Sequence, residues 1–156
     1  MKVAFWCIGK TEDAYILEGF ALYQKRLTNY LSFEYKEILF PKGKKATNAA
    51  LHQELEKDEI LKLLKPNDTL ILLDEKGKEF DSTGFSTFMQ KMFNESNGSL
   101  VFLAGGAYGF HKDIYHRANQ NISLSRMTFT HQMVRLIFIE QLYRAMTILK
   151  GEPYHH

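Results

Sequence analysis

The sequence predicts an α/β domain with a mostly parallel sheet and helices on both faces. Short, nearly uninterrupted apolar runs alternate along the chain with longer segments whose apolar residues recur at helical spacing. Uninterrupted runs are typical of strands buried on both faces, as in a parallel sheet, and helices between them are typical of the crossovers that join parallel strands. The length of 156 residues suits one domain, which we expect to span residues 1–156.

The chain begins with a strand, a helix and a second strand. Residues 3–9 form an apolar run that ends at a glycine, which predicts a buried strand. Thr11 can cap a helix that continues to about residue 27, because apolar side chains recur there at helical spacing. Residues 31–39 alternate enough for a strand, and Pro41 ends it.

A second helix and a short third strand follow. Thr47 or Asn48 opens the helix, and Pro66 stops it near residue 64 because proline lacks the N–H that a helix interior needs. Residues 69–73 are expected to form the strand. After Asp74, which ends this strand, the sequence Glu-Lys-Gly-Lys predicts a turn.

A third helix and a fourth buried strand come next. Asp81 or Ser82 is expected to cap the helix, its phenylalanine and methionine residues have the spacing of core positions, and Asn97-Gly98 ends it. The strand at residues 100–104 continues into a glycine-rich loop.

The final third of the chain contains an unusual helix. A short helix at 112–118 and a short strand or loop at 122–124 precede it, and it covers about residues 130–149. This last helix is apolar on nearly every side, although Arg135 and Arg144 interrupt it. Because a surface helix normally shows one apolar stripe, we expect it to contact a second subunit as well as its own core.

The charges are distributed unevenly although the formal net charge is only +2. Four of the five arginines and five of the six histidines follow residue 98, while most lysines precede it. Arginine presents a planar fork suited to phosphate, which indicates a phosphate-bearing partner. Equally, these arginines can cap helices or pair with Glu140 or a neighbouring residue, and composition does not choose between the two readings.

The composition also indicates a cytoplasmic protein. Cys7 is the only cysteine, so no intrachain disulfide is possible, and it is expected to be an inert core residue. The N-terminal apolar run is too short for a signal sequence, and no run approaches the roughly 20 residues that span a bilayer. We therefore expect no membrane partner. His111 and His116 lack the spacing of metal ligands, and no metal site is expected.

Three loops mark the expected binding site. Ligands of open parallel sheets bind beyond the carboxyl ends of the strands. The loops at such ends are the one after Leu73, the glycine loop after Ala104, and the segment 125–130. Taken alone, Gly105-Gly106 is more often a tight turn than a ligand site, since it lacks the spacing of a nucleotide fingerprint.

Five motifs, in this order, resemble the ribosomal RNA large-subunit methyltransferase H family of the SPOUT superfamily. They are 73–78 (Leu-Asp-Glu-Lys-Gly-Lys), 102–109 (Phe-Leu-Ala-Gly-Gly-Ala-Tyr-Gly), 123–131 (from Ser-Leu-Ser to Thr128 and His131), 140–145 (Glu-Gln-Leu-Tyr-Arg-Ala) and 153–155 (Pro-Tyr-His). The resemblance covers the whole chain, and the last two motifs are highly specific. It implies a C-terminal trefoil knot, a homodimer and S-adenosylmethionine as methyl donor.

The resemblance also implies the residues of the site. The methyl donor would be bound by Leu73, Gly105, Gly106, Ser125, Arg126, Met127, Thr128, Phe129 and Thr130. The catalytic group would be Arg144, Tyr154 and His155, with the tail reaching toward the partner's cofactor. The implied product is N3-methylpseudouridine in 23S ribosomal RNA of the assembled ribosome.

One departure from the family pattern and two rival functions remain. His156 stands where family tails commonly carry Arg or Lys, which would weaken phosphate contact near neutral pH. A dimeric nucleotide-binding module would explain the glycine loop but not the arginine-bearing final helix. A purely structural dimer would explain that helix but would leave the loop 125–130 without a role.

Overall fold

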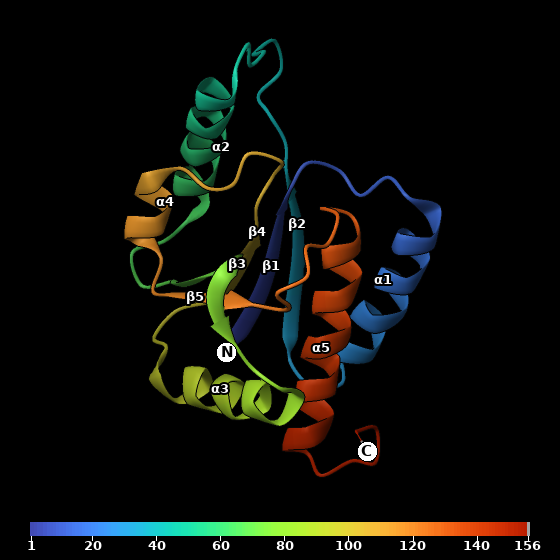
Figure 1. The fold of residues 1–156 in the computed structure, drawn as a ribbon. Coiled ribbons are helices and arrows are strands. Elements are labelled where there is room, and N and C mark those ends of the chain that lie inside the picture. The colour runs from blue at the N-terminus through green and yellow to red at the C-terminus, as the bar shows by residue number, and fades with distance from the viewer. Residues whose placement is uncertain (156) are drawn as a thin grey trace.

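A computed structural model describes residues 1–155, and His156 lies outside the described residues. Five strands form one parallel sheet in the order β2-β1-β4-β3-β5 (Figure 1). The strands are β1 (Lys2–Ile8), β2 (Ser32–Ile38), β3 (Thr69–Glu79), β4 (Leu100–Ala104) and β5 (Gln120–Ser123). The predicted α/β class with a parallel sheet is therefore confirmed.

Helices cover both faces of this sheet. They are α1 (Ala14–Leu27), α2 (Ala49–Leu63), α3 (Ser82–Glu95), α4 (Lys112–Arg117) and α5 (Met133–Leu149). In Figure 1, α1, α3 and α5 lie on one side of the sheet, and α2 and α4 lie on the other. Of the two candidate N-caps that the sequence offered for α2 and for α3, the structure selects Asn48 and Asp81, whose side chains accept the backbone N–H groups of Leu51 and Gly84.

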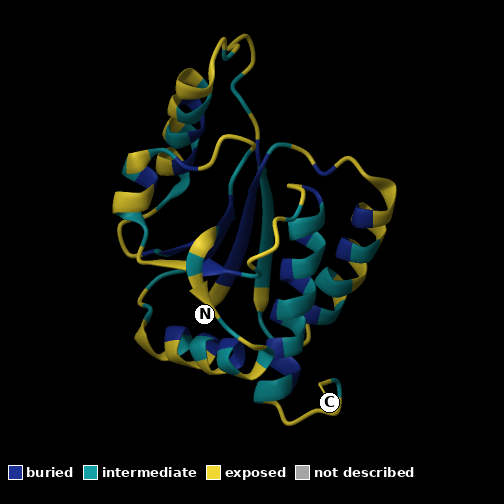
Figure 2. Ribbon diagram, viewed as in Figure 1, coloured by how far each residue is buried: buried dark blue, intermediate teal, exposed yellow. Residues whose placement is uncertain are grey.

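Two apolar layers make up the core, one on each face (Figure 2). Alternate residues of β1 divide between them: Phe5 faces α1, α3 and α5, whereas Trp6 faces α2 and α4. The central strands are buried on both sides, which is why their sequences are uninterrupted apolar runs.

The third strand differs from the prediction. The sequence Glu-Lys-Gly-Lys, expected to be a turn, belongs to β3, which pairs with β5 again at Lys78 and Glu79 after a register shift. Gly77 allows this, since a Cβ there would lie 2.5 Å from the backbone carbon of Ile122. The pairing partner is distant in sequence, so the local pattern did not reveal it.

The helix starts also differ in detail. Helix α5 begins at Met133 rather than near residue 130, and Asp13 rather than Thr11 precedes α1. Thr11 is instead buried, and its backbone N–H donates to Glu37. Within residues 1–155, no helix is both long and apolar enough to cross a membrane.

Candidate functional site

A cavity of about 660 Å³ opens at the carboxyl ends of β4 and β5, beside the middle of β3. Segments 73–76, 104–110 and 123–131 supply most of its walls, and Tyr115 and Val134 complete them. These are the three segments that the sequence singled out, although residues 73–76 belong to β3 and not to a loop after it. The volume is within the range of small-molecule sites, and the walls mix apolar side chains with backbone groups.

The glycine loop forms one wall because its backbone must pass close to other elements. A Cβ on Gly105 would lie 3.1 Å from the ring of Phe110, and one on Gly106 would lie 2.6 Å from Oε1 of Glu56. Glycine at these two positions therefore avoids a steric clash with Phe110 and Glu56. It also leaves one wall of the cavity made largely of main chain, which can read a ligand through N–H and C=O groups.

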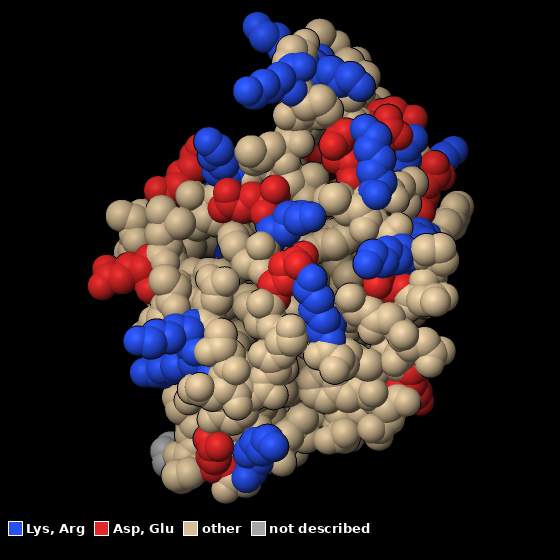
Figure 3. Space-filling view, turned by 180° about the vertical axis from the view of Figure 1, so that it is seen from behind, with Lys and Arg blue, Asp and Glu red and all other residues tan. Residues whose placement is uncertain are grey.

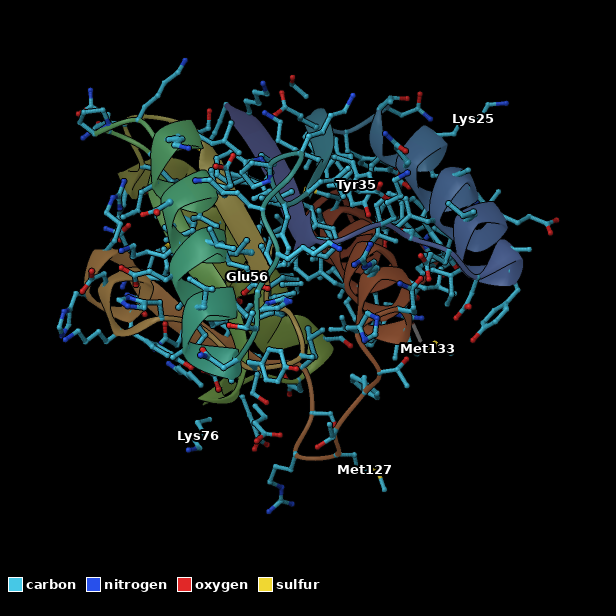
Figure 4. All side chains as sticks on the ribbon, turned by 90° about the horizontal axis from the view of Figure 1, so that it is seen from above. Lys25, Tyr35, Glu56, Lys76, Met127 and Met133 are labelled. Carbon is cyan, nitrogen blue, oxygen red and sulfur yellow. The ribbon has the colours of Figure 1, made fainter. Side chains whose placement is uncertain are left out.

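The segment 125–130 forms the opposite wall and is stabilised by its own polar side chains. The N–H of Met127 donates to Ser125 Oγ at 2.9 Å, and the N–H of Met133 donates to Thr130 Oγ1 at 3.1 Å. Thr128 donates to Glu75 across the cavity. Met127 is 79% exposed at the outer end of this loop, as Figure 4 shows.

All but one of the nine cofactor residues implied by the resemblance line this cavity. The exception is Arg126, whose side chain is 88% exposed and lies 3.8 Å from Glu79. Sequence reasoning did not assign a role to Phe110 or Tyr115, which also line the cavity. Phe110 could have been identified as a lining residue from the sequence, because it comes directly after the glycine loop.

Asp74 connects two walls of the cavity. Its carboxylate accepts the backbone N–H of Lys76 at 2.8 Å and also the hydroxyl of Tyr115. Partial burial and the hydrogen bond to Asp74 raise the pKa of Tyr115 to about 12, so this hydroxyl stays protonated at neutral pH. Asp74 thus orders the irregular middle of β3 and fixes the position of α4 relative to it.

The three proposed catalytic side chains form a second cluster, at the other end of α5. Arg144 lies 2.7 Å from Glu140 Oε1, and its guanidinium also lies over the Tyr154 ring, 4.8 Å from the centroid. Tyr154 donates to the same Glu140 oxygen at 3.0 Å, and Arg144 Nη1 lies 3.3 Å from His155 Nδ1. Glu140, which sequence reasoning considered only as a pairing partner, is the centre of this cluster.

The protonation states in this cluster follow from the hydrogen bonds. Partial burial and hydrogen bonds with Tyr23 and Glu140 raise the pKa of Tyr154 above its ordinary value, so its hydroxyl remains a donor. An arginine N–H can only donate, so Nδ1 of His155 is the acceptor in this contact. The group therefore contains one cation, one hydroxyl donor and one imidazole that can accept a proton.

Within one chain the cavity and this cluster are far apart. Val134 lines the cavity and Arg144 follows ten residues later on the same helix, a distance of about 15 Å at the helical rise per residue. A single subunit therefore does not bring the proposed catalytic residues to the proposed cofactor residues.

Arg135 belongs to neither group. It is 1% exposed, and its guanidinium donates to the carbonyls of Ile8, Gly9 and His131 and to Thr11 Oγ1. It fixes the carboxyl end of β1 against the start of α5. Arg135 therefore has a structural role and does not bind phosphate. Arg144 pairs with Glu140, which is the second of the two roles that the sequence allowed for these arginines.

No group of three or more His, Cys, Asp or Glu side chains within residues 1–155 is placed to hold a metal ion. The polar groups that line the cavity are mostly hydroxyls and backbone amides, together with the carboxylates of Asp74 and Glu75, the ammonium of Lys76 and the imidazole of His131. This set suits a small organic ligand that carries both polar and positively charged parts.

Comparison with known proteins agrees with the sequence motifs. A family model described as predicted SPOUT methyltransferase matches residues 1–155. A protein of Cytophaga hutchinsonii is 57% identical over the whole of both chains, and one of Parabacteroides distasonis is 52% identical over all of this chain and 99% of its own. A third, from Christiangramia forsetii, is 47% identical with the same coverage. All three are named ribosomal RNA large subunit methyltransferase H.

Proposed function

Because the chain belongs to the SPOUT methyltransferase family, we propose that it methylates N3 of a pseudouridine in 23S ribosomal RNA on the assembled ribosome. The names of its relatives support ribosomal RNA as the substrate. The family also implies the C-terminal trefoil knot. The whole chain, residues 1–156, acts as one domain in this proposal, and a ribosomal substrate puts it in the cytoplasm.

S-Adenosylmethionine fits the cavity as the methyl donor. The glycine loop and the segment 125–130 offer backbone groups to an adenine and a ribose, and Leu73 and Phe129 offer apolar contact. Asp74 and Glu75 outnumber Lys76 among the charged side chains of the lining, and this net negative charge favours a cationic ligand. When bound, S-adenosylmethionine supplies a methyl group already activated on a sulfonium, so no metal is required.

We propose that a second copy of the chain completes the site. The face of α5 that is turned away from the core carries Met133, Ile137 and Ile148, which are half-buried and do not pack on the core cluster. Figure 4 shows Met133 at the start of this face. Pairing two such faces would cover apolar surface and would allow the tail of one subunit to approach the cavity of the other.

The Arg144, Tyr154 and His155 cluster has the groups that the reaction needs. N3 of pseudouridine must lose its proton before it can attack, and negative charge then spreads onto the flanking carbonyl oxygens. The imidazole of His155 can take the proton. Arg144 and the protonated hydroxyl of Tyr154 can donate to the oxygens, which stabilises the charge as it develops.

The observation that carries this proposal is that every cofactor residue implied by the resemblance except Arg126 lines one cavity, although three separate segments supply them. The test is transfer of labelled methyl from S-adenosylmethionine to ribosomes that lack the modification, with free 23S RNA alongside. We expect label on N3 of a pseudouridine and far better transfer to ribosomes than to RNA, because RNA is recognised largely by shape and the assembled ribosome fixes the shape around the target.

Two variants test the proposed catalytic group. Tyr154→Phe and Arg144→Ala should lower the rate of transfer without lowering S-adenosylmethionine binding. If both variants kept the full rate, the proposed catalytic group would be wrong. If no label reached ribosomes while S-adenosylmethionine still bound, the chain would be a binding module or would act on another RNA.

A further inference from the structure

We propose that the loop between β2 and α2, residues 39–48, binds phosphates of the RNA around the target nucleotide. We call this segment the lysine loop. The inference rests on the proposed function, because it assumes that RNA is the substrate. It adds an RNA-contact surface that is separate from the cavity and from the tail.

The charge of the lysine loop is not neutralised by the protein. Lys42, Lys44 and Lys45 are exposed, and none of them makes an ion pair within residues 1–155. On the adjacent helix, by contrast, Lys57 and Lys62 pair with glutamates at 2.7 and 2.6 Å. Unpaired lysines held together repel one another, and phosphates relieve that repulsion.

The shape of the molecule presents these charges to a large partner. In Figure 1 the lysine loop projects beyond the rest of the structure at the top. Figure 3 shows basic side chains gathered at the same apex, with no acidic side chain among them on that face. A projecting tip can reach the backbone of a folded RNA without the body of the protein colliding with it.

The tip of the lysine loop is a defined turn. The N–H of Lys44 donates to the carbonyl of Pro41 at 3.2 Å, and Gly43 between them has φ of 81°. Glycine with positive φ at the third position is typical of a type II turn. The lysines therefore lie on an ordered turn, so the backbone loses less conformational entropy when they bind phosphates.

Aromatic contacts join the lysine loop to the wall of the cavity. The ring of Phe40 packs edge-on against His52 at 4.3 Å, and His52 packs in the same way against Tyr108 at 5.0 Å. Gln53 also donates to the carbonyl of Tyr108 at 2.7 Å. Tyr108 belongs to the glycine loop, so the lysines are tied to the segment that lines the cavity.

This arrangement suits RNA in particular. The lysine loop follows the carboxyl end of β2, so it lies at the same end of the parallel sheet as the cavity, although β2 is the edge strand farthest from β5. Tyr108 is 52% exposed between the lysines and the cavity, and an exposed ring offers a base a surface for stacking. Lysine contacts with phosphates add affinity and position the RNA without reading its sequence.

The test compares two triple variants that remove the same charge. One replaces Lys42, Lys44 and Lys45 of the lysine loop with Gln. The matched control replaces Lys57, Lys62 and Lys91, which pair with acids elsewhere on the surface. Binding to ribosomes is measured over a range of salt concentrations, together with KM and kcat for methyl transfer and the thermal shift with S-adenosylmethionine.

We expect the loop variant to raise KM about tenfold or more and to reduce the slope of log affinity against log salt by about two to three. Its kcat and its thermal shift should stay near those of the wild type, and the control should change little. Equal losses in both variants, or an unchanged salt slope in the loop variant, would overturn the inference.

A photo-crosslinking residue at Thr47 identifies the partner directly. Adducts with 23S RNA support the inference, whereas adducts with ribosomal proteins alone would overturn it. The salt and crosslinking measurements do not require turnover. Failure of the proposed function, seen as a wild type without activity on ribosomes, is thus distinguishable from failure of this inference.

Discussion

Arg135 shows how much one side chain contributes to this structure. A charge that is 1% exposed persists only because backbone carbonyls and Thr11 occupy its donors. Glu37, 3.9 Å away, adds a partly buried counter-charge. The residue therefore acts on stability and is not available for RNA.

Replacing Arg135 should destabilise the fold strongly. For Arg135→Met we expect a loss of about 3 to 5 kcal/mol in the free energy of unfolding, because several buried acceptors lose their donor at once. Urea denaturation measures this. The control is Arg126→Met, whose side chain is 88% exposed and which should change stability by less than about 0.5 kcal/mol. Similar losses in the two variants would contradict the structural role given to Arg135.

Cys7 gives a prediction that depends on pH. Burial raises the pKa of the Cys7 thiol to about 12, from 9.0 in the unfolded chain. The unfolded state therefore loses this proton at lower pH than the folded state does. Its contribution to stability is fully present below about pH 9 and is lost as the pH rises toward 12.

The measurement compares the wild type with Cys7→Ala by urea denaturation at pH 8 and pH 10.5. Between these values we expect the wild type to lose about 2 kcal/mol more than the variant, at about 1.36 kcal/mol for each pH unit above the unfolded-state pKa of 9.0. The variant also controls for tyrosines, several of which have raised pKa values as well. If the wild type and Cys7→Ala lost the same amount of unfolding free energy between the two pH values, the thiol would be accessible to solvent in the folded state.

At the scale of elements, α5 decides how the molecule is assembled. It packs against α1 on one side and α3 on the other, so even alone it has no exposed residue between Met133 and Leu149. This explains why its sequence is apolar on nearly every side. Helices α1 and α3 therefore bury much of the apolar surface of α5 that we expected a second subunit to bury.

The outward face of α5 still carries enough apolar surface to predict a dimer interface. Ile137→Lys places a charge on this face, and we expect it to convert a dimer into a monomer in sedimentation experiments. The control is Leu22→Lys on α1, where the native leucine is already 48% exposed. A dimer that persists in Ile137→Lys, or a wild type that sediments as a monomer, would contradict the proposed interface.

At the scale of the whole molecule, the central question is whether two subunits share one site. The cavity and the Arg144 cluster lie about 15 Å apart along α5. Mixed dimers answer this. One subunit carries Ser125→Trp, which fills the cavity, and the other carries Arg144→Ala, which removes the cation of the tail.

We expect each variant to be inactive alone and the refolded mixture to regain about a quarter of wild-type activity. Half of the dimers are then mixed, and each mixed dimer has one intact cavity opposite one intact tail. The assay is methyl transfer to ribosomes. A mixture that stays inactive, although mixed dimers are shown to form, would mean that each site is built within one subunit.

Much of the fold and part of the candidate site were accessible from the sequence. Apolar runs predicted the three central strands β1, β3 and β4, and Asn48 and Asp81 were each one of two candidate caps, because capping depends on a few adjacent residues. The three loops of the cavity followed from the rule that parallel strands present their carboxyl ends at one edge. The pairing of Glu140 with Arg144 was visible as an i, i+4 spacing.

Tertiary structure decided what depends on partners distant in the chain. The extension of β3 past Asp74 requires β5, more than 40 residues later, and Gly77 accepts the close backbone contact. Arg135 and Arg144 look alike in sequence, yet one is enclosed by β1 and the other lies at the surface beside the tail. Propensity and periodicity act over a few residues, whereas burial and backbone partners are set only when distant segments meet.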